Sequence, residues 1–341
     1  MKQKAYLLIV LLCSFVQGAL AWDGSGTSAD PYLIKNSADW KQLSDDVVGG
    51  ESYSGKFFEM TADIDAQGIS VGSESKPFSG TFSGGMYTLT YNAGTISRYT
   101  EGLHAPFVLL KGAAIKDLKV VGAIYSKSKY SAGLACFVDG AKTTTVSGCH
   151  VSTQINGSYD VNADANFGGF VAYVKSTSSN PLTFTNCSFQ GFLGDFTAGS
   201  ACFVGFTRVP VSIEHCVVDP YTVFQGIANT ATFVRAADGV NCTLKECYYT
   251  QAYGAEQGQG VFKSVEMPKG CTAEIVGEPT LRCNGVNYYG AGTKVSLTVP
   301  EGTQFDHWTT EGKPVGCFIS DPWTASGIHT IYDIRTQPKL S

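Results

Sequence analysis

Charged residues are scarce in this chain, at 16% of 341 residues, and bases are fewer than acids. The formal net charge of −5 argues against nucleic acid or an anionic membrane as the partner. No segment after residue 21 is apolar for long enough to cross a bilayer, so no integral membrane segment is expected. The low charge and the 39 Gly favour β-structure and turns over helices.

The chain also lacks the motifs of several catalytic and metal-binding classes. It has no HExxH, no GxSxG and no Gly-rich phosphate loop that opens a helix. Its Cys residues show no CxxC spacing, which disfavours a zinc site. The five His are scattered, and no acidic residue recurs at a fixed interval. We therefore predict no catalytic residues and interpret the chain as a binding protein rather than an enzyme.

The first 21 residues predict a signal peptide. Lys2 and Lys4 give a basic start, an apolar run covers 6–16, and Ala19 and Ala21 form a small-residue cleavage site. The run is too short to span a bilayer, which disfavours an anchored helix. Cleavage removes two Lys and no acid, so the mature net charge becomes 22 − 29 = −7. We expect an exported protein, at the cell surface or extracellular, with the periplasm as the alternative.

An aromatic residue followed by Val recurs along the middle of the chain. The copies are Phe107-Val108, Phe137-Val138, Tyr173-Val174, Phe203-Val204 and Phe233-Val234. The intervals between them are 30, 36, 30 and 30 residues, and looser matches at Phe78 and Phe262 extend the series. A period in this range is typical of a stacked repeat.

A second motif follows each aromatic residue. It consists of an apolar residue, Leu or Cys three positions later, and another apolar residue two positions after that. Its copies are 115–120, 146–151, 184–189, 213–218 and 244–249. The three-residue step has the wrong parity for one flat strand, so each copy predicts two strands with a bend between them. The corner should fall on Asp117, Gly148, Asn186, His215 and Glu246, which are mostly polar or turn-forming.

Equivalent positions on strands that run the same way predict a coil whose turns stack roughly 4.8 Å apart. Parallel crossovers prefer a right-handed winding. The predicted fold class is all-β: a right-handed parallel β-helix of about six coils over 22–270. A helix with its N-cap at Ser37 and with Trp40, Leu43 and Val47 on one face is expected to cover the first edge.

Stacking of like residues leaves two alternatives open. Cys149, Cys187, Cys216 and Cys247 fall on one row, where free buried thiols are favoured over disulfides. An aromatic residue and the Val beside it cannot both face inward. Packing of the aromatic residues in the core or under a loop is favoured, and an exposed stripe suited to stacking on sugar rings is the alternative.

The 36-residue interval requires a longer loop, which 156–166 supplies. Asp160, Asn162, Asp164 and Asn166 place side-chain oxygens at every second residue. The spacing partly matches a calcium loop, although the Gly and the distal Glu of that motif are absent. An exposed Asx-rich turn is the simpler interpretation. The four residues are the candidate ligand-binding site, with Ca²⁺ at Asp160, Asn162 and Asp164 as the candidate cofactor.

The period ends after Phe262, and Pro268 and Gly270 mark a junction. Short alternating runs between Gly/Pro turns predict a second, small β-sandwich or β-repeat domain over 271–341. Its strands are expected at 293–299, 317–319 and 329–334.

Several stretches near the start share residues with a known family. They are Asp30-Pro31-Tyr32-Leu33-Ile34, Ala38-Asp39-Trp40, Gly55-Lys56-Phe57-Phe58 and Pro77-Phe78-Ser79-Gly80-Thr81-Phe82. They resemble the start of secreted bacterial β-helix proteins with GLUG-type repeats, common in gut Bacteroidetes and in the non-catalytic part of some surface proteases and adhesins. The likeness covers about 22–265. Ser83-Gly84-Gly85-Met86 stands where that family usually has Asp-Gly-Asn-Gly.

A second resemblance lies near the C-terminus. Tyr288-Tyr289, Ala291-Gly292-Thr293 and the following Gly302, Phe305 and Trp308 are similar to small β-grasp-like or sandwich repeats on bacterial surface proteins. Both resemblances imply surface display and binding. The leading hypothesis is an adhesin-like protein that recognises a glycan or a host or cell-surface protein. The alternative is a carbohydrate-active enzyme, a polysaccharide lyase or glycoside hydrolase, because such folds often carry that activity.

Overall fold

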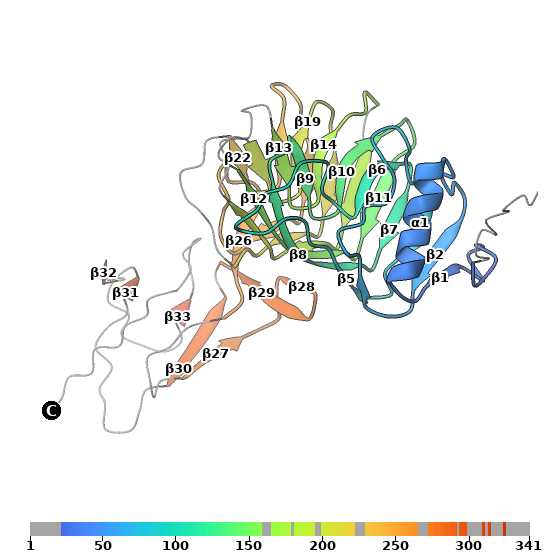
Figure 1. Ribbon diagram of the computed structural model, residues 1–341. Coiled ribbons are helices and arrows are strands. Elements are labelled where there is room, and N and C mark those ends of the chain that lie inside the picture. The colour runs from blue at the N-terminus through green and yellow to red at the C-terminus, as the bar shows by residue number, and fades with distance from the viewer. Residues whose placement is uncertain are drawn as a thin grey trace, which may run out of the picture.

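The computed structural model describes most of the chain from Trp22 to Thr298 and three short strands beyond it (Figure 1). The described ranges are 22–158, 165–178, 181–194, 199–221, 229–264, 272–291, 293–298, 309–310, 313–314 and 323–324. Within them all regular elements are strands except one helix, α1 (Ser37–Gly49), which confirms the all-β prediction. Among these residues no helix is long and apolar enough to cross a membrane. The predicted signal peptide, 1–21, lies outside the described residues.

Four sheets form the main body. The eight-stranded sheet holds, in spatial order, β1 (Tyr32–Ile34), β2 (Phe57–Met60), β4 (Thr81–Ser83), β7 (Ala114–Lys116), β11 (Thr144–Ser147), β15 (Leu182–Thr185), β20 (Ser212–Glu214) and β24 (Thr243–Lys245). The five-stranded sheet holds β6 (Phe107–Lys111), β10 (Ala135–Asp139), β14 (Val171–Val174), β19 (Val204–Thr207) and β23 (Val234–Ala236). The four-stranded sheet holds β9 (Tyr130–Ala132), β13 (Asn166–Gly168), β18 (Gly199–Ala201) and β22 (Thr230–Ala231).

The eleven-stranded sheet is the longest and joins the two ends of the molecule. It holds β3 (Ile64–Asp65), β5 (Thr88–Thr90), β8 (Lys119–Ser126), β12 (His150–Gly157), β16 (Ser188–Phe189), β21 (Val217–Val218), β25 (Tyr248–Tyr249), β26 (Gln259–Phe262), β29 (Val286–Gly290) and β28 (Leu281–Cys283), with β17 (Phe192–Gly194) also paired to β12. Beyond it, β27 (Thr272–Val276), β30 (Lys294–Thr298) and β33 (Trp323–Thr324) form one small sheet, and β31 (Thr309–Thr310) and β32 (Lys313–Pro314) form another.

The chain visits the four sheets in a fixed order. From β6 it passes to β7, β8 and β9, each in a different sheet, and returns as β10 beside β6. The next circuits repeat this path and add a strand to each sheet in turn. Neighbouring strands of successive circuits pair in parallel. The body in Figure 1 is therefore a coil whose turns are joined by parallel backbone hydrogen bonds.

The register confirms the predicted bent motif. The first apolar residue of each copy lies in one row of the eight-stranded sheet, and the last lies in one row of the eleven-stranded sheet. The chain leaves one sheet for the next at the predicted corner, where φ is positive in every copy. The values are +52° at Asp117, +61° at Gly148, +55° at Asn186, +52° at His215 and +50° at Glu246. The left-handed residue redirects the backbone between the two strands.

The register contradicts the predicted alignment of the aromatic–Val pairs. Phe137 and Tyr173 are Cα partners, but Tyr173 pairs with Phe206 and not with Phe203. The prediction was wrong because aromatic residues occupy two rows of this wall of the coil. Phe203 and Phe233 lie in the core with ring centroids 5.1 Å apart, whereas Phe137 lies outside it in a separate cluster.

The turns of the coil also differ in length more than the dipeptides indicated. The equivalent residues in the five-stranded sheet are Phe107, Ala135, Val171, Val204 and Val234. Their separations are 28, 36, 33 and 30 residues by subtraction of these positions. The 156–166 segment is therefore not the only place where the interval changes, since the next turn is also longer than 30 residues.

Cysteines fill one row of the core, as predicted. Cys149, Cys187, Cys216 and Cys247 are buried free thiols. Each thiol donates to a backbone carbonyl, and Cys187 Sγ lies 3.3 Å from the oxygen of Thr185. Burial raises the pKa of Cys149 and Cys187 well above the usual range of a thiol. These residues behave as small apolar side chains and not as reactive thiolates.

Helix α1 closes the first end of the coil, as predicted (Figure 1). Its N-cap is Asn36, one residue before the predicted Ser37, because the Asn36 side chain accepts hydrogen bonds from two free N–H groups of the first turn. Trp40 is fully buried and its ring lies 5.6 Å from that of Phe107. Its indole N–H donates to the carbonyl of Ile69 at 2.9 Å. Trp40 therefore packs into the first end of the core and also holds the helix against it by a hydrogen bond.

A hairpin, β28–β29, extends the eleven-stranded sheet through antiparallel pairing of β29 with β26. Tyr288 on this hairpin donates its hydroxyl to the buried carboxylate of Asp219 at 2.9 Å. Lys263 Nζ and Thr250 Oγ1 also donate to Asp219, at 2.7 and 2.8 Å. The Tyr288 bond fastens the hairpin to the coil, and the other two complete the hydrogen bonding of the buried carboxylate. Of the strands predicted beyond it, 293–299 corresponds to β30, and 317–319 and 329–334 lie outside the described residues.

We predict that Gly148→Ala lowers the free energy of unfolding by about 1–2 kcal/mol, because a Cβ is unfavourable in the left-handed region. The added atom would also lie 2.4 Å from Asp117 Oδ1. Gly49→Ala is the matched control, because it is helical and has no heavy atom within 4 Å of its new Cβ. Urea denaturation of both variants is the measurement. A Gly148→Ala protein as stable as the parent would contradict the left-handed corner.

We also predict that the row of thiols is closed to alkylation in the native protein and open after denaturation. Mass spectrometry after iodoacetamide treatment should find Cys149, Cys187 and Cys216 modified only in denaturant, because burial shields them. Cys242 is only half-buried and should be the first of the described cysteines to react in the native state. Thiols that stay unmodified in denaturant without reductant would indicate disulfides instead.

Candidate functional site

The outer surface of the five-stranded sheet carries a second row of large side chains. Leu109, Phe137, Tyr173 and Phe206 occupy equivalent positions on four neighbouring strands. Side chains alternate between the two faces of a strand, and Val138 and its partner Val174 are buried in the main core. The row therefore faces away from the interior, and parallel pairing sets its residues side by side.

The rings of this row stack on one another. Tyr173 and Phe206 lie with centroids 6.0 Å apart and planes only 7° from parallel. Tyr130, on β9, turns its ring toward Tyr173 at 5.8 Å and toward Phe137 at 4.9 Å. Tyr173 and Phe206 remain partly exposed, and Phe137 is fully buried beneath its neighbours. The favoured alternative, packed aromatic residues, is thus confirmed for Phe107, Phe137, Phe203 and Phe233, whereas Tyr173 is partly exposed.

One end of the row is closed by an ion pair. The ammonium of Lys175 lies 3.6 Å from the centre of the Phe137 ring and 2.7 Å from Glu74 Oε1. Its charge is therefore already matched. This leaves Tyr173 and Phe206 as the accessible part of the row.

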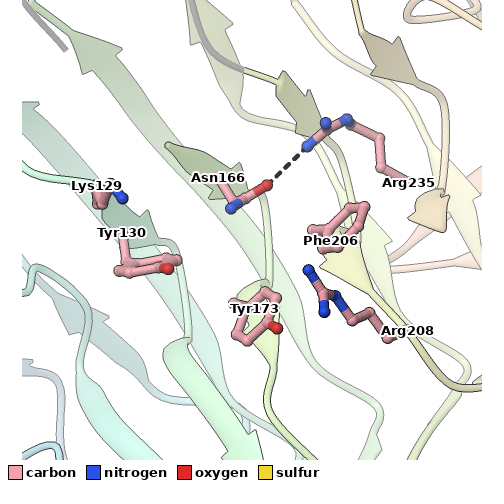
Figure 2. Close-up of a pocket in the computed structure, with 7 residues that line it drawn as sticks. All are labelled: Lys129, Tyr130, Asn166, Tyr173, Phe206, Arg208 and Arg235. Carbon is pink, nitrogen blue, oxygen red and sulfur yellow. Dashed lines mark hydrogen bonds between the residues drawn. The ribbon is translucent and has the colours of Figure 1, made fainter. Parts of the chain in front are cut away.

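A pocket of about 400 Å³ opens beside these two rings (Figure 2). Its size is within the ~300–1,000 Å³ range of small-molecule sites. The pocket is lined by Lys129, Tyr130, Asn166, Tyr173, Phe206, Arg208 and Arg235. Strands β9, β13, β14, β19 and β23 contribute to it, so the four-stranded and five-stranded sheets form it together.

The Arg235 side chain is held by two hydrogen bonds and lies against an aromatic ring. Its Nη1 donates to Asn166 Oδ1 at 2.9 Å and to the carbonyl of Gly205 at 2.8 Å. The guanidinium carbon lies 5.4 Å from the centre of the Phe206 ring. A Cβ on Gly199 would fall 1.9 Å from this carbon, so the guanidinium rests directly on the backbone of β18. Partial burial lowers the pKa of Arg235, but a guanidinium stays protonated at physiological pH.

The lining is cationic in a chain whose net charge is negative. Among the described residues that line the pocket, three are bases and none is Asp or Glu. Arg208 is exposed, and its guanidinium makes no ion pair within the described residues. Figure 2 shows its guanidinium near the Phe206 ring, on the side away from Arg235. The described part of the pocket thus places arginine side chains beside two partly exposed aromatic rings.

Of the four residues in the candidate ligand site predicted from the sequence, the structure describes one, Asn166. Asp160, Asn162 and Asp164 lie outside the described residues, and the calcium prediction therefore stays a prediction. Asn166 belongs to β13 and lines the pocket, where its side-chain oxygen accepts from Arg235. In the described part of the chain no group of three or more His, Cys, Asp or Glu is arranged to hold a metal.

The sequence reasoning missed the cations and the ring at Phe206. Phe206 and Arg208 are two residues apart, a spacing that places both on one face of a strand. That signal was available, but the dipeptide pattern drew attention to Phe203. Arg235 meets Asn166 across 69 positions of the chain, and only the stacking of the turns brings them together.

A Ser–His pair elsewhere has the contacts of a nucleophile and base but lies out of reach of solvent. His150 Nδ1 is 2.9 Å from Ser188 Oγ, and both residues are buried. Burial lowers the pKa of His150 to about 4, so its ring is neutral at pH 7. Cys283 of the β28–β29 hairpin contacts Ser188 and is itself buried. The pair is therefore part of the packing beneath the hairpin.

No family model matches the chain, and no curated protein matches it in sequence. Among solved structures, a similar chain is a candidate immunoglobulin A1 protease from Bacteroides ovatus. The two chains are 15% identical with a TM-score of 0.40, over 70% of this chain and 83% of the other. A likeness of that size assigns neither a family nor an activity to this protein.

Proposed function

We propose that the chain is an exported surface protein that binds glycans, built on a right-handed parallel β-helix of the GLUG-like kind. The observation that carries this proposal is the partly exposed pair of stacked rings, Tyr173 and Phe206, beside a pocket of about 400 Å³. Aromatic faces are large, rigid and apolar, which suits them to pack against the C–H face of a pyranose ring. The pocket is the site of recognition.

The scaffold favours binding because the side chains are held on strands. Tyr173 and Phe206 are fixed by the parallel pairing of β14 with β19 and by each other. Tyr173 OH makes no hydrogen bond within the described residues and is free to bond a ligand hydroxyl. A site on regular strands loses little conformational freedom when a ligand binds.

The glycoside hydrolase alternative has less support in the described part of this pocket. Glycoside hydrolysis generally requires two carboxyl groups on either side of the scissile bond. The described residues of the lining include no Asp or Glu that could serve as this pair. A lyase would need a general base and a group that stabilises the developing negative charge. Because either enzyme would release cleaved product, product release is measured in the same experiment as binding.

We predict that the purified mature chain binds a subset of a glycan array without releasing reducing ends or unsaturated sugars. Tyr173→Ala should weaken binding to the bound glycans roughly tenfold, as expected for the loss of one stacking surface. Tyr87→Ala is the control, because Tyr87 is 40% exposed and lies outside the pocket. Equal melting temperatures would exclude a folding defect. No bound glycan, or equal affinity in Tyr173→Ala, would contradict the proposal, and product release would favour the enzyme.

A further inference from the structure

We infer that Arg235 is a positioning residue of this pocket: it clamps a β-bulge in β19 and thereby holds the ring of Phe206 in place for the glycan. This inference rests on the proposed function and identifies the side chain that keeps one of the two rings in position. It requires no contact between Arg235 and the ligand, because the residue acts through Phe206.

A bulge lies between β19 and β23 beside the pocket. Two residues of β19, Gly205 and Phe206, face a single residue of β23, Arg235, because the register shifts by one residue between two regular pairs. These pairs are Val204 with Val234 and Thr207 with Ala236. On its other side β19 pairs with β14 in regular register, so Phe206 stays beside Tyr173. Bulges are a common means of aiming a side chain next to a functional site.

The Arg235 side chain bonds to the bulge itself. Its Nη1 donates to the carbonyl of Gly205, one of the two residues of the bulge, at 2.8 Å. The same Nη1 donates to the side-chain oxygen of Asn166 on β13 at 2.9 Å (Figure 2). One guanidinium therefore ties the bulged strand to the neighbouring four-stranded sheet.

The guanidinium also lies between the Phe206 ring and the backbone of β18. Its carbon is 5.4 Å from the centre of the ring, and a Cβ on Gly199 would lie 1.9 Å from that carbon. The planar fork of an arginine can rest on an aromatic ring while its N–H groups bond to carbonyl oxygens. A lysine ammonium is a compact charge and cannot make both kinds of contact in this geometry.

Phe206 is the last ring of the outer row, which explains why it needs such a neighbour. Tyr173 stacks on it from β14, with the ring centroids 6.0 Å apart, and β23 places Arg235 at the next position instead of another ring. With a contact on each side, the ring has one orientation before the ligand arrives. A ring held in this way loses little conformational freedom on binding.

The test is a double-mutant cycle between Arg235 and Phe206, with the array glycan that the parent chain binds most tightly as the titrated ligand. Arg235→Lys keeps the charge and should lower the affinity about tenfold, because the hydrogen bonds of the fork are lost. In a Phe206→Ala background the same substitution should change the affinity by less than about twofold, because Arg235 acts through that ring. The melting temperature of every variant is measured to detect a loss of fold.

A second variant displaces the guanidinium without changing Arg235. Gly199→Ala places a Cβ on the guanidinium carbon and should lower the affinity as Arg235→Lys does. Arg98→Lys is the matched control, because Arg98 is exposed and is not among the residues that line the pocket. A measurement without ligand is amide hydrogen exchange of the peptide that contains Gly205 and Phe206. Its exchange should be at least about threefold faster in Arg235→Lys and Gly199→Ala, because the bulge opens locally, and unchanged in Arg98→Lys.

The outcomes separate this inference from the proposed function. An Arg235→Lys protein with the affinity of the parent, or an equal loss of affinity with and without the Phe206 ring, would overturn the positioning role and leave glycan binding intact. Unchanged hydrogen exchange at the bulge in both Arg235→Lys and Gly199→Ala would overturn the clamp. A parent chain that binds no glycan would overturn both the proposed function and this inference.

Discussion

Parallel pairing between successive turns of the chain is the interaction on which the rest of this structure depends. Each turn lies directly above the previous one, so equivalent residues stack in rows about one strand spacing apart. Inside, this arrangement produces the row of Cys149, Cys187, Cys216 and Cys247. Outside, the same rule sets Phe137, Tyr173 and Phe206 side by side. The core and the proposed binding surface are therefore formed by the inner and outer faces of the same parallel sheets.

The pocket forms where the outer aromatic row of the five-stranded sheet ends. At one end the outer row is buried by Tyr130 and by the matched pair of Lys175 and Glu74. At the other end the aromatic residues give way to Arg235, and a hollow forms between the two sheets. A rigid scaffold, two partly exposed rings and the side chains of Lys129, Arg208 and Arg235 then meet at one place. The proposed recognition of a glycan would use the scaffold and the rings together.

Much of the coil was predictable because its signals are local. The corner between the two strands of each copy was placed correctly at Asp117, Gly148, Asn186, His215 and Glu246, since the parity of the apolar residues requires a bend there. Trp40 as the buried residue of a covering helix followed from its 3.6-residue spacing. The aromatic rows were assigned wrongly, because Phe203 and Phe206 are both plausible rungs and only the register chooses between them.

The sequence by itself determined the all-β class, the bent motif, the buried thiols and the helix at the first end, because each depends on residues within a few positions of one another. Only the tertiary structure decided which aromatic residues face outward and which cations accompany them. Loops of unequal length change the number of residues between equivalent positions from turn to turn. A local sequence pattern does not show which residues then become partners on neighbouring strands. Asn166 was singled out from the sequence for its oxygen, but its partner, Arg235, follows 69 residues later and comes beside it only when the turns stack.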